Sequence, residues 1–78
     1  MKLWLLRPAV GATQWDPWYD KACGFVIRAE TGSRAREIAQ HKAGDEGGDA
    51  WADPASSTCD ELSADGLEGV VMIDFRSA

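Results

Sequence analysis

Few residues of this chain belong to the types on which disulfide frameworks and metal sites depend. It has two cysteines and one histidine in 78 residues. Because no secretory signal is visible at the N-terminus, we expect Cys23 and Cys59 to stay reduced in a cytoplasmic protein. His41 has no second ligand at helical spacing, so the sequence predicts no metal site, and nothing in it calls for a cofactor.

Long apolar runs are also missing. The longest, such as Leu3–Leu6 and Val70–Ile73, are far shorter than the roughly 20 residues of a membrane-spanning helix. The composition, 45% hydrophobic and 27% charged, is nevertheless too apolar for a disordered chain. We therefore expect one small soluble domain over residues 1–78 that does not enter a membrane.

Basic side chains are absent between residues 45 and 68, where eight of the 13 acids lie. With a net charge of −5, the chain has little reason to bind a phosphate backbone directly. The acidic stretch either keeps a small domain in solution or attracts a basic partner. Its members are Asp45, Glu46, Asp49, Asp53, Asp60, Glu61, Asp65 and Glu68.

Three segments have the patterns of β-strands. Lys2–Arg7 is apolar on both faces, which is typical of a central strand, whereas Phe25–Glu30 alternates and suits a sheet edge or a strand with one solvated face. Val70–Phe75 is expected to be the last strand. Ser57–Leu62 is either an additional short strand or a turn of helix.

One helix is expected between the second and last strands. Thr31–Ser33 offers an N-cap and Gly44 a C-cap glycine, and the apolar stripe between them is narrow: Ala35, Ile38 and Ala39. The predicted fold is α+β with the order β-β-α-β, a small and mainly antiparallel sheet of strand order 2-1-3, and the helix on one face. The other face needs a cover, for which the loop tryptophans are the candidates.

Aromatic residues cluster in the loop that precedes the second strand, and four tryptophans are many for so short a chain. They either close over the open face of the sheet or form a recognition surface of rigid rings with polar neighbours. The candidate docking residues are Trp15, Trp18, Tyr19 and Trp51, with the acids Asp16, Asp20, Asp45, Glu46 and Asp49.

Two arginines in the first turn of the predicted helix oppose the helix dipole. Together with the backbone N–H groups of that turn, they suggest an anion-binding site made of Thr31, Ser33, Arg34 and Arg36. A plain N-cap explains the same residues. No nucleophile and base have a spacing that is typical of a catalytic pair. The carboxylates are too numerous for any two to be identified as a general acid and base, so we expect no enzymatic activity.

Three segments carry a resemblance: Trp15–Lys21 (WDPWYDK), Gly24–Glu30 (GFVIRAE) and Ala43–Gly47 (AGDEG). Together they resemble small uncharacterised proteins encoded by bacteriophages and bacterial mobile elements. The resemblance brings no assigned activity, but it implies a protein that works in the cytoplasm of a host cell. Small acidic α+β proteins of phages are often inhibitors that cap a host protein, including components of antiviral defence.

The leading expectation is therefore a non-enzymatic protein-binding module, an inhibitor that docks on a host macromolecule with a basic surface. The alternative is an oligomer that binds or sequesters a small ligand such as a nucleotide. In that alternative the aromatic rings stack on the base, and Arg34 and Arg36 hold the phosphate.

Overall fold

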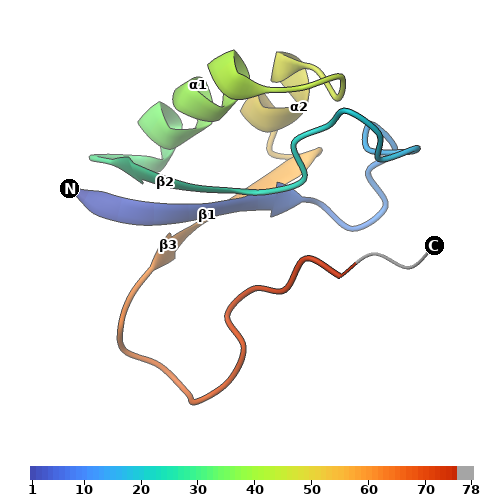
Figure 1. Cartoon of the computed structure of the whole chain (residues 1–78). Coiled ribbons are helices and arrows are strands. Elements are labelled where there is room, and N and C mark those ends of the chain that lie inside the picture. The colour runs from blue at the N-terminus through green and yellow to red at the C-terminus, as the bar shows by residue number, and fades with distance from the viewer. Residues whose placement is uncertain (76–78) are drawn as a thin grey trace.

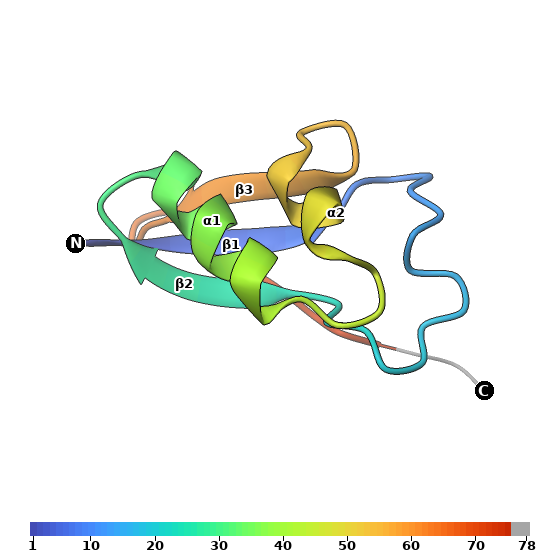
Figure 2. The same ribbon diagram turned by 90° about the horizontal axis from the view of Figure 1, so that it is seen from above.

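Three strands form one antiparallel sheet in the computed structural model, which describes residues 1–75 (Figure 1). They are β1 (Lys2–Pro8), β2 (Phe25–Ala29) and β3 (Ser57–Leu62), arranged in the order β2-β1-β3. Two helices, α1 (Gly32–Lys42) and the short α2 (Gly48–Ala52), lie over one face of the sheet (Figure 2). This confirms the predicted α+β fold, in which the first strand is central and antiparallel to both neighbours.

The central position of β1 follows from its apolar residues on both faces. Leu6 is fully buried beneath the helices, and Leu5, on the opposite face, is only 3% exposed. Each edge strand pairs with β1 over five or six positions, with Trp4 opposite Ile27 on one side and Glu61 on the other. Because opposed residues share a face, the even-numbered side chains of β1 point toward the helices and the odd-numbered ones away.

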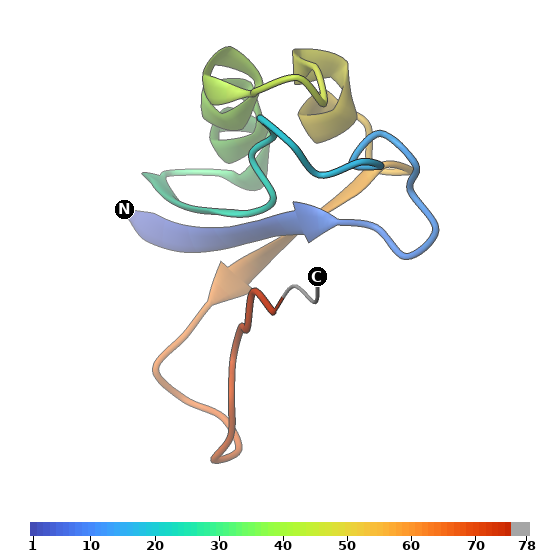
Figure 3. The same cartoon turned by 45° about the vertical axis from the view of Figure 1, so that its right-hand side comes forward.

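The third strand is not the one expected from the sequence. Ser57–Leu62, which was ambiguous between strand and helix, takes the place beside β1, and Val70–Phe75 is not a strand. A short turn after α2 places β3 beside the edge of β1 that β2 leaves free. Because β3 occupies this edge, Val70–Phe75 cannot pair there. Residues 63–75 instead lie on the side of the sheet opposite the helices, where the chain first leads away from the sheet and then turns back toward it (Figures 1 and 3).

Helix α1 begins and ends at the expected residues. The Thr31 hydroxyl accepts a hydrogen bond from the backbone N–H of Arg34 at 3.1 Å, which confirms the N-cap. Gly44 directly follows the C-cap residue, Ala43, but it does not adopt the left-handed backbone expected of a C-cap glycine. A glycine is needed there because a Cβ atom would collide with the carbonyl oxygen of Asp20.

The core lies between the sheet and the helices, and two indoles complete it, Trp15 from the loop before β2 and Trp51 from α2. Trp15 and Trp51 pack in one cluster with the alanines of α1 and the inner side chains of the sheet. The Trp51 ring lies edge-on to both Trp15 and Phe25, with centroids 5.0 Å apart in each pair. The two indoles thus add buried apolar area beside the narrow alanine stripe of α1. They were expected to cover the opposite face of the sheet, and this expectation is wrong.

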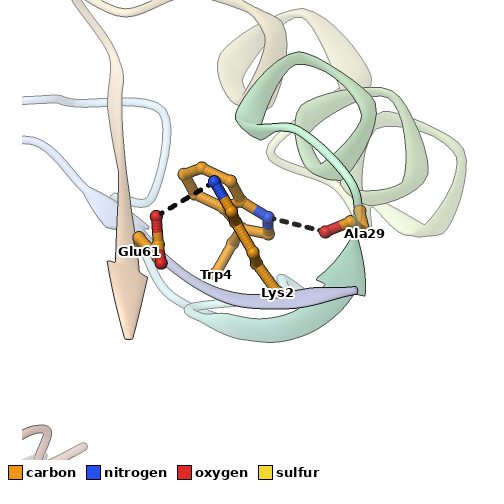
Figure 4. A network of polar contacts seen from close by, with 4 residues as sticks. All are labelled: Lys2, Trp4, Ala29 and Glu61. Carbon is orange, nitrogen blue, oxygen red and sulfur yellow. Dashed lines mark hydrogen bonds and ion pairs between the residues drawn. The ribbon is translucent and has the colours of Figure 1, made fainter. Parts of the chain in front are cut away.

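The fourth tryptophan anchors the other end of the sheet. The Trp4 indole donates from Nε1 to the carbonyl oxygen of Ala29 at 3.0 Å, and Lys2 pairs with Glu61 at 3.6 Å beside it (Figure 4). A Cβ atom on Gly32 would lie 3.3 Å from the Trp4 ring. Glycine therefore lets the start of α1 approach the sheet closely.

Arg36 ties both helices to β3. Its guanidinium donates from Nη1 to the Trp51 carbonyl oxygen (2.8 Å) and the Ser57 hydroxyl (2.9 Å), and from Nη2 to the Ser57 carbonyl oxygen (3.0 Å). Ser57 is fully buried, so these bonds satisfy polar groups that water does not reach.

Replacement of Arg36 by alanine is expected to lower the free energy of unfolding by about 1–3 kcal/mol, because three acceptor oxygens near the core lose this donor. Urea unfolding followed by tryptophan fluorescence measures the change. The matched control is Arg34→Ala, which removes the same charge from an exposed side chain whose pair with Glu37, at 3.8 Å, lies in solvent. The control should change stability by less than about 0.5 kcal/mol, and equal losses for both variants would contradict the structural role of Arg36.

Candidate functional site

The aromatic loop splits into an inward and an outward half. Trp15 and Trp51 are buried on the helix side of the sheet, so the predicted cover over the opposite face is wrong, and both rings are unavailable to a docked partner. Trp18 and Tyr19 are 47% and 65% exposed, as the recognition interpretation predicts. The two exposed rings lie side by side, with centroids 5.0 Å apart and planes tilted by 36°.

Glu46 holds the buried half of the loop in place. One carboxylate oxygen, Oε2, accepts from the Trp51 indole N–H at 2.5 Å, and the other, Oε1, accepts from the backbone N–H of Ala22 at 3.0 Å. Trp15 in turn donates from its indole to the Ala22 carbonyl oxygen at 2.6 Å. Glu46 was expected among the outward-facing acids, but it is buried because both of its oxygens accept hydrogen bonds inside the protein.

The exposed half of the loop is also held by the segment that contains Glu46, through Gly44 and Asp45. The backbone N–H of Asp45 donates to the Asp20 carbonyl oxygen at 2.8 Å, and Gly44 packs against this carbonyl. Within the loop, the Lys21 ammonium donates to the Pro17 carbonyl oxygen, and the Asp16–Pro17 peptide bond is cis. These contacts place Asp45 beside the loop that carries Trp18 and Tyr19.

We define the aromatic–acidic site as the exposed ring pair and the three exposed acids around it. Its residues are Asp16, Trp18, Tyr19, Asp20 and Asp45. Asp16 and Asp20 flank the rings along the chain. Asp45 lies beside this loop because its backbone N–H is hydrogen-bonded to the carbonyl oxygen of Asp20. The site therefore combines rigid aromatic rings with negative charge, on a backbone that hydrogen bonds anchor to the rest of the fold.

The remaining acids of residues 45–68 do not form one surface. Asp49 is exposed in the first turn of α2. Asp53 stabilises the turn into β3, where its carboxylate accepts from the Ala55 N–H and the Ser56 hydroxyl. Glu61 pairs with Lys2. The acids of residues 45–61 thus serve several local purposes: Asp45 and Glu46 contact the aromatic loop, and of these two Asp45 is exposed.

The four residues of the expected anion site do not converge on a ligand. The Thr31 hydroxyl is used as the helix cap, Arg34 pairs with Glu37, and the Arg36 guanidinium binds Trp51 and Ser57. Ser33 is exposed within α1. The plain N-cap interpretation accounts for this end of the helix.

Both cysteines are free thiols that pack against the edge of the core. The Cys59 thiol lies 3.7 Å from the carbonyl oxygen of Gly32. Burial raises the pKa of Cys59 above its ordinary value, the Arg36 charge partly offsets this rise, and Asp60 adds to it. Cys59 is therefore held as a neutral thiol near pH 7, and it is a poor nucleophile.

Comparisons with family models, curated proteins and solved structures find no match to this chain. The resemblance to proteins of phages and mobile elements remains a prediction. Among residues 1–75, no pocket is present, no cluster of three or more potential ligands lies close enough to hold a metal ion, and no helix is long and apolar enough to span a membrane.

Replacement of Glu46 by glutamine is expected to lower the free energy of unfolding by about 1–3 kcal/mol. Two donors face the carboxylate, and the amide NH₂ of glutamine must oppose one of them. Urea unfolding measures the loss, with Asp49→Asn as the control that removes the same charge from an exposed position. A Glu46→Gln variant as stable as this control would contradict the structural role of Glu46.

The raised pKa of Cys59 predicts a shifted pH profile of alkylation. In a Cys23→Ser variant, the midpoint of the rate of reaction with iodoacetamide should lie at higher pH for the folded chain than for the same chain unfolded in urea. The thiolate form is the nucleophile, and burial disfavours it only in the folded state. Coinciding midpoints would show that the folded environment of Cys59 does not disfavour the thiolate.

Proposed function

We propose that this chain is a non-enzymatic protein-binding module that docks on a basic surface of another protein through the aromatic–acidic site. The observation that carries the proposal is the exposure of Trp18 and Tyr19 on a loop fixed by buried contacts. Trp and Tyr side chains dominate the energetics of protein interfaces, because they offer large rigid area and a polar group at modest entropic cost.

The rigidity of the loop supports docking because it lowers the cost of association. A flexible loop loses conformational entropy when it binds, whereas a loop already ordered in the free protein loses little. Here the segment before the rings is anchored by Trp15, and the segment after them by the contacts of Asp20 and Ala22 with residues 44–46. The exposed rings therefore stand on a preformed backbone.

The charge of the site favours a partner with Lys and Arg. Asp16 and Asp20 flank the ring pair along the chain, and the backbone of Asp45 is hydrogen-bonded to Asp20. The cation within the loop, Lys21, donates to a carbonyl of the same loop. Aromatic faces also attract guanidinium and ammonium groups, so rings and carboxylates select the same type of side chain. At a net charge of −5, the whole chain adds long-range attraction toward a basic surface.

In line with the resemblance to phage and mobile-element proteins, we propose that the partner is a host protein and that the chain inhibits it by covering a functional surface. Antiviral defence components are the partners that this origin favours. The contacts of Arg36 disfavour the nucleotide alternative, because its guanidinium is bound to Trp51 and Ser57 and would lose those hydrogen bonds if it held a phosphate.

The test is affinity capture from host lysate by the immobilised chain, with the captured proteins quantified by mass spectrometry and the enriched one then purified for binding measurements. Trp18→Ala and Tyr19→Ala are each expected to weaken binding by about tenfold or more. Asp20→Asn should mainly slow association and reduce its dependence on salt.

Val10→Ala is the matched control, because Val10 is a fully exposed apolar residue in the turn that follows β1 and lies outside the site. It should capture the same protein with unchanged affinity. If the Trp18 and Tyr19 variants bind as tightly as the control variant, the aromatic–acidic site is not the docking surface.

A further inference from the structure

The chain that follows β3 is open to solvent along its whole described length. Residues 63–75, which we call the exposed segment, contain no helix or strand, and every one of them is exposed. The exposed fraction of their six large apolar side chains runs from 40% at Met72 to 100% at Leu67. The exposed segment lies on the side of the sheet opposite the helices without adding a strand to it (Figures 1 and 3).

The backbone of the exposed segment is as accessible as its side chains. Within residues 1–75, none of the backbone–backbone hydrogen bonds outside helices and strands includes a residue of this segment. One local bond, from the backbone N–H of Asp65 to the Ser63 hydroxyl at 3.1 Å, precedes the apolar run. A Cβ atom on Gly66 or Gly69 would meet no described atom within 4 Å beyond its chain neighbours. Another protein can therefore reach this backbone without opening the fold.

An endoprotease requires both of these properties in its substrate. It binds the substrate as an extended chain, forms hydrogen bonds with its backbone, and places one side chain in a specificity pocket. A chain that is already paired in a helix, sheet or turn must open before it fits, so exposed segments are the preferred sites of cleavage. Leu67 and residues 70–73 offer large apolar side chains to such a pocket.

Val10 shows that an exposed apolar side chain is not sufficient. Its side chain is fully exposed, but its backbone lies in a turn that the Ala12 N–H closes by donating to the Ala9 carbonyl oxygen at 3.1 Å. The Ala9 N–H in turn donates to the carbonyl oxygen of Ser56 at 2.9 Å, which ties the turn to the residue before β3. A protease would have to break these bonds before it could bind Val10.

We propose that residues 66–73 are a processing site for an endoprotease whose specificity pocket takes large apolar side chains. One peptide bond is hydrolysed there: the bond between carbonyl carbon and nitrogen breaks, the carbon keeps the oxygen of the water in a carboxylate, and the two protons of the water convert the nitrogen to an ammonium group. The cut separates the apolar residues that follow it from residues 1–62. These retain the three strands, both helices and the residues of the aromatic–acidic site.

Digestion with a small amount of thermolysin tests the site, because this metalloprotease cuts before large apolar residues. Mass spectrometry identifies the products and their rates of formation. Cleavage before Leu67 or within residues 70–73 should be about tenfold or more faster than cleavage before Val10 or elsewhere in residues 1–62. The large product should keep the tryptophan fluorescence spectrum of the whole chain, because all four tryptophans and every described helix and strand precede the cut.

Two variants separate cleavage of the folded chain from cleavage after unfolding. Ile27→Val removes a methyl group from a buried position, so cuts within residues 1–62 should become about fivefold faster while the rate at the site stays unchanged. Replacement of the apolar side chains of the site by serine should slow cleavage there about tenfold or more. The combined substitutions are Leu67→Ser, Val70→Ser, Val71→Ser, Met72→Ser and Ile73→Ser.

Three results would overturn the proposal. The first is an initial cut before Val10 or elsewhere within residues 1–62, because the exposed segment would then not be the preferred substrate. The second is a rate at the site that rises with Ile27→Val as much as the other cuts do, because cleavage would then depend on unfolding. The third is a large product that loses the fluorescence spectrum of the folded chain.

Discussion

Most of this small structure depends on the two hydrogen bonds that the buried carboxylate of Glu46 accepts. The carboxylate accepts these bonds from the indole of Trp51 and the backbone of Ala22, and it thereby joins the segment before α2 to the loop before β2. A buried carboxylate is costly unless hydrogen bonds satisfy it, and here two donors do so. The same bonds keep two indoles in the core, where their area compensates for a helix whose buried stripe is mostly alanine.

The exposed face of the loop follows from that buried arrangement. Since Trp15 points into the core and Asp20 is hydrogen-bonded to Asp45, the residues between them turn outward from a backbone held at both ends. Trp18 and Tyr19 are therefore presented to solvent as a fixed ring pair beside carboxylates. One set of contacts stabilises the fold and prepares a surface for a partner.

Both helices lie on one side of the sheet, and the other side is therefore left without a helix to cover its apolar residues. Both helices and the buried indoles of Trp15 and Trp51 lie on the same face, and within the described residues 1–75 the opposite face has the segment 63–75 beside it. That segment keeps the alternating apolar pattern of a strand, but β3 occupies the edge of β1 that it was expected to join. Its apolar side chains are therefore left in solvent, where another protein can reach them.

Local patterns in the sequence determined the apolar central strand, the cap at Thr31 and the α1 helix, because side-chain periodicity and capping chemistry act within a few residues. The tertiary structure alone decided which segment lies beside β1, which loop indoles are buried, and that Glu46 faces inward while Asp45 faces solvent. Trp15 and Trp18, or Asp45 and Glu46, have similar local propensities. Their different positions result from contacts between residues distant in the chain, such as Glu46 with Ala22 and Arg36 with Ser57.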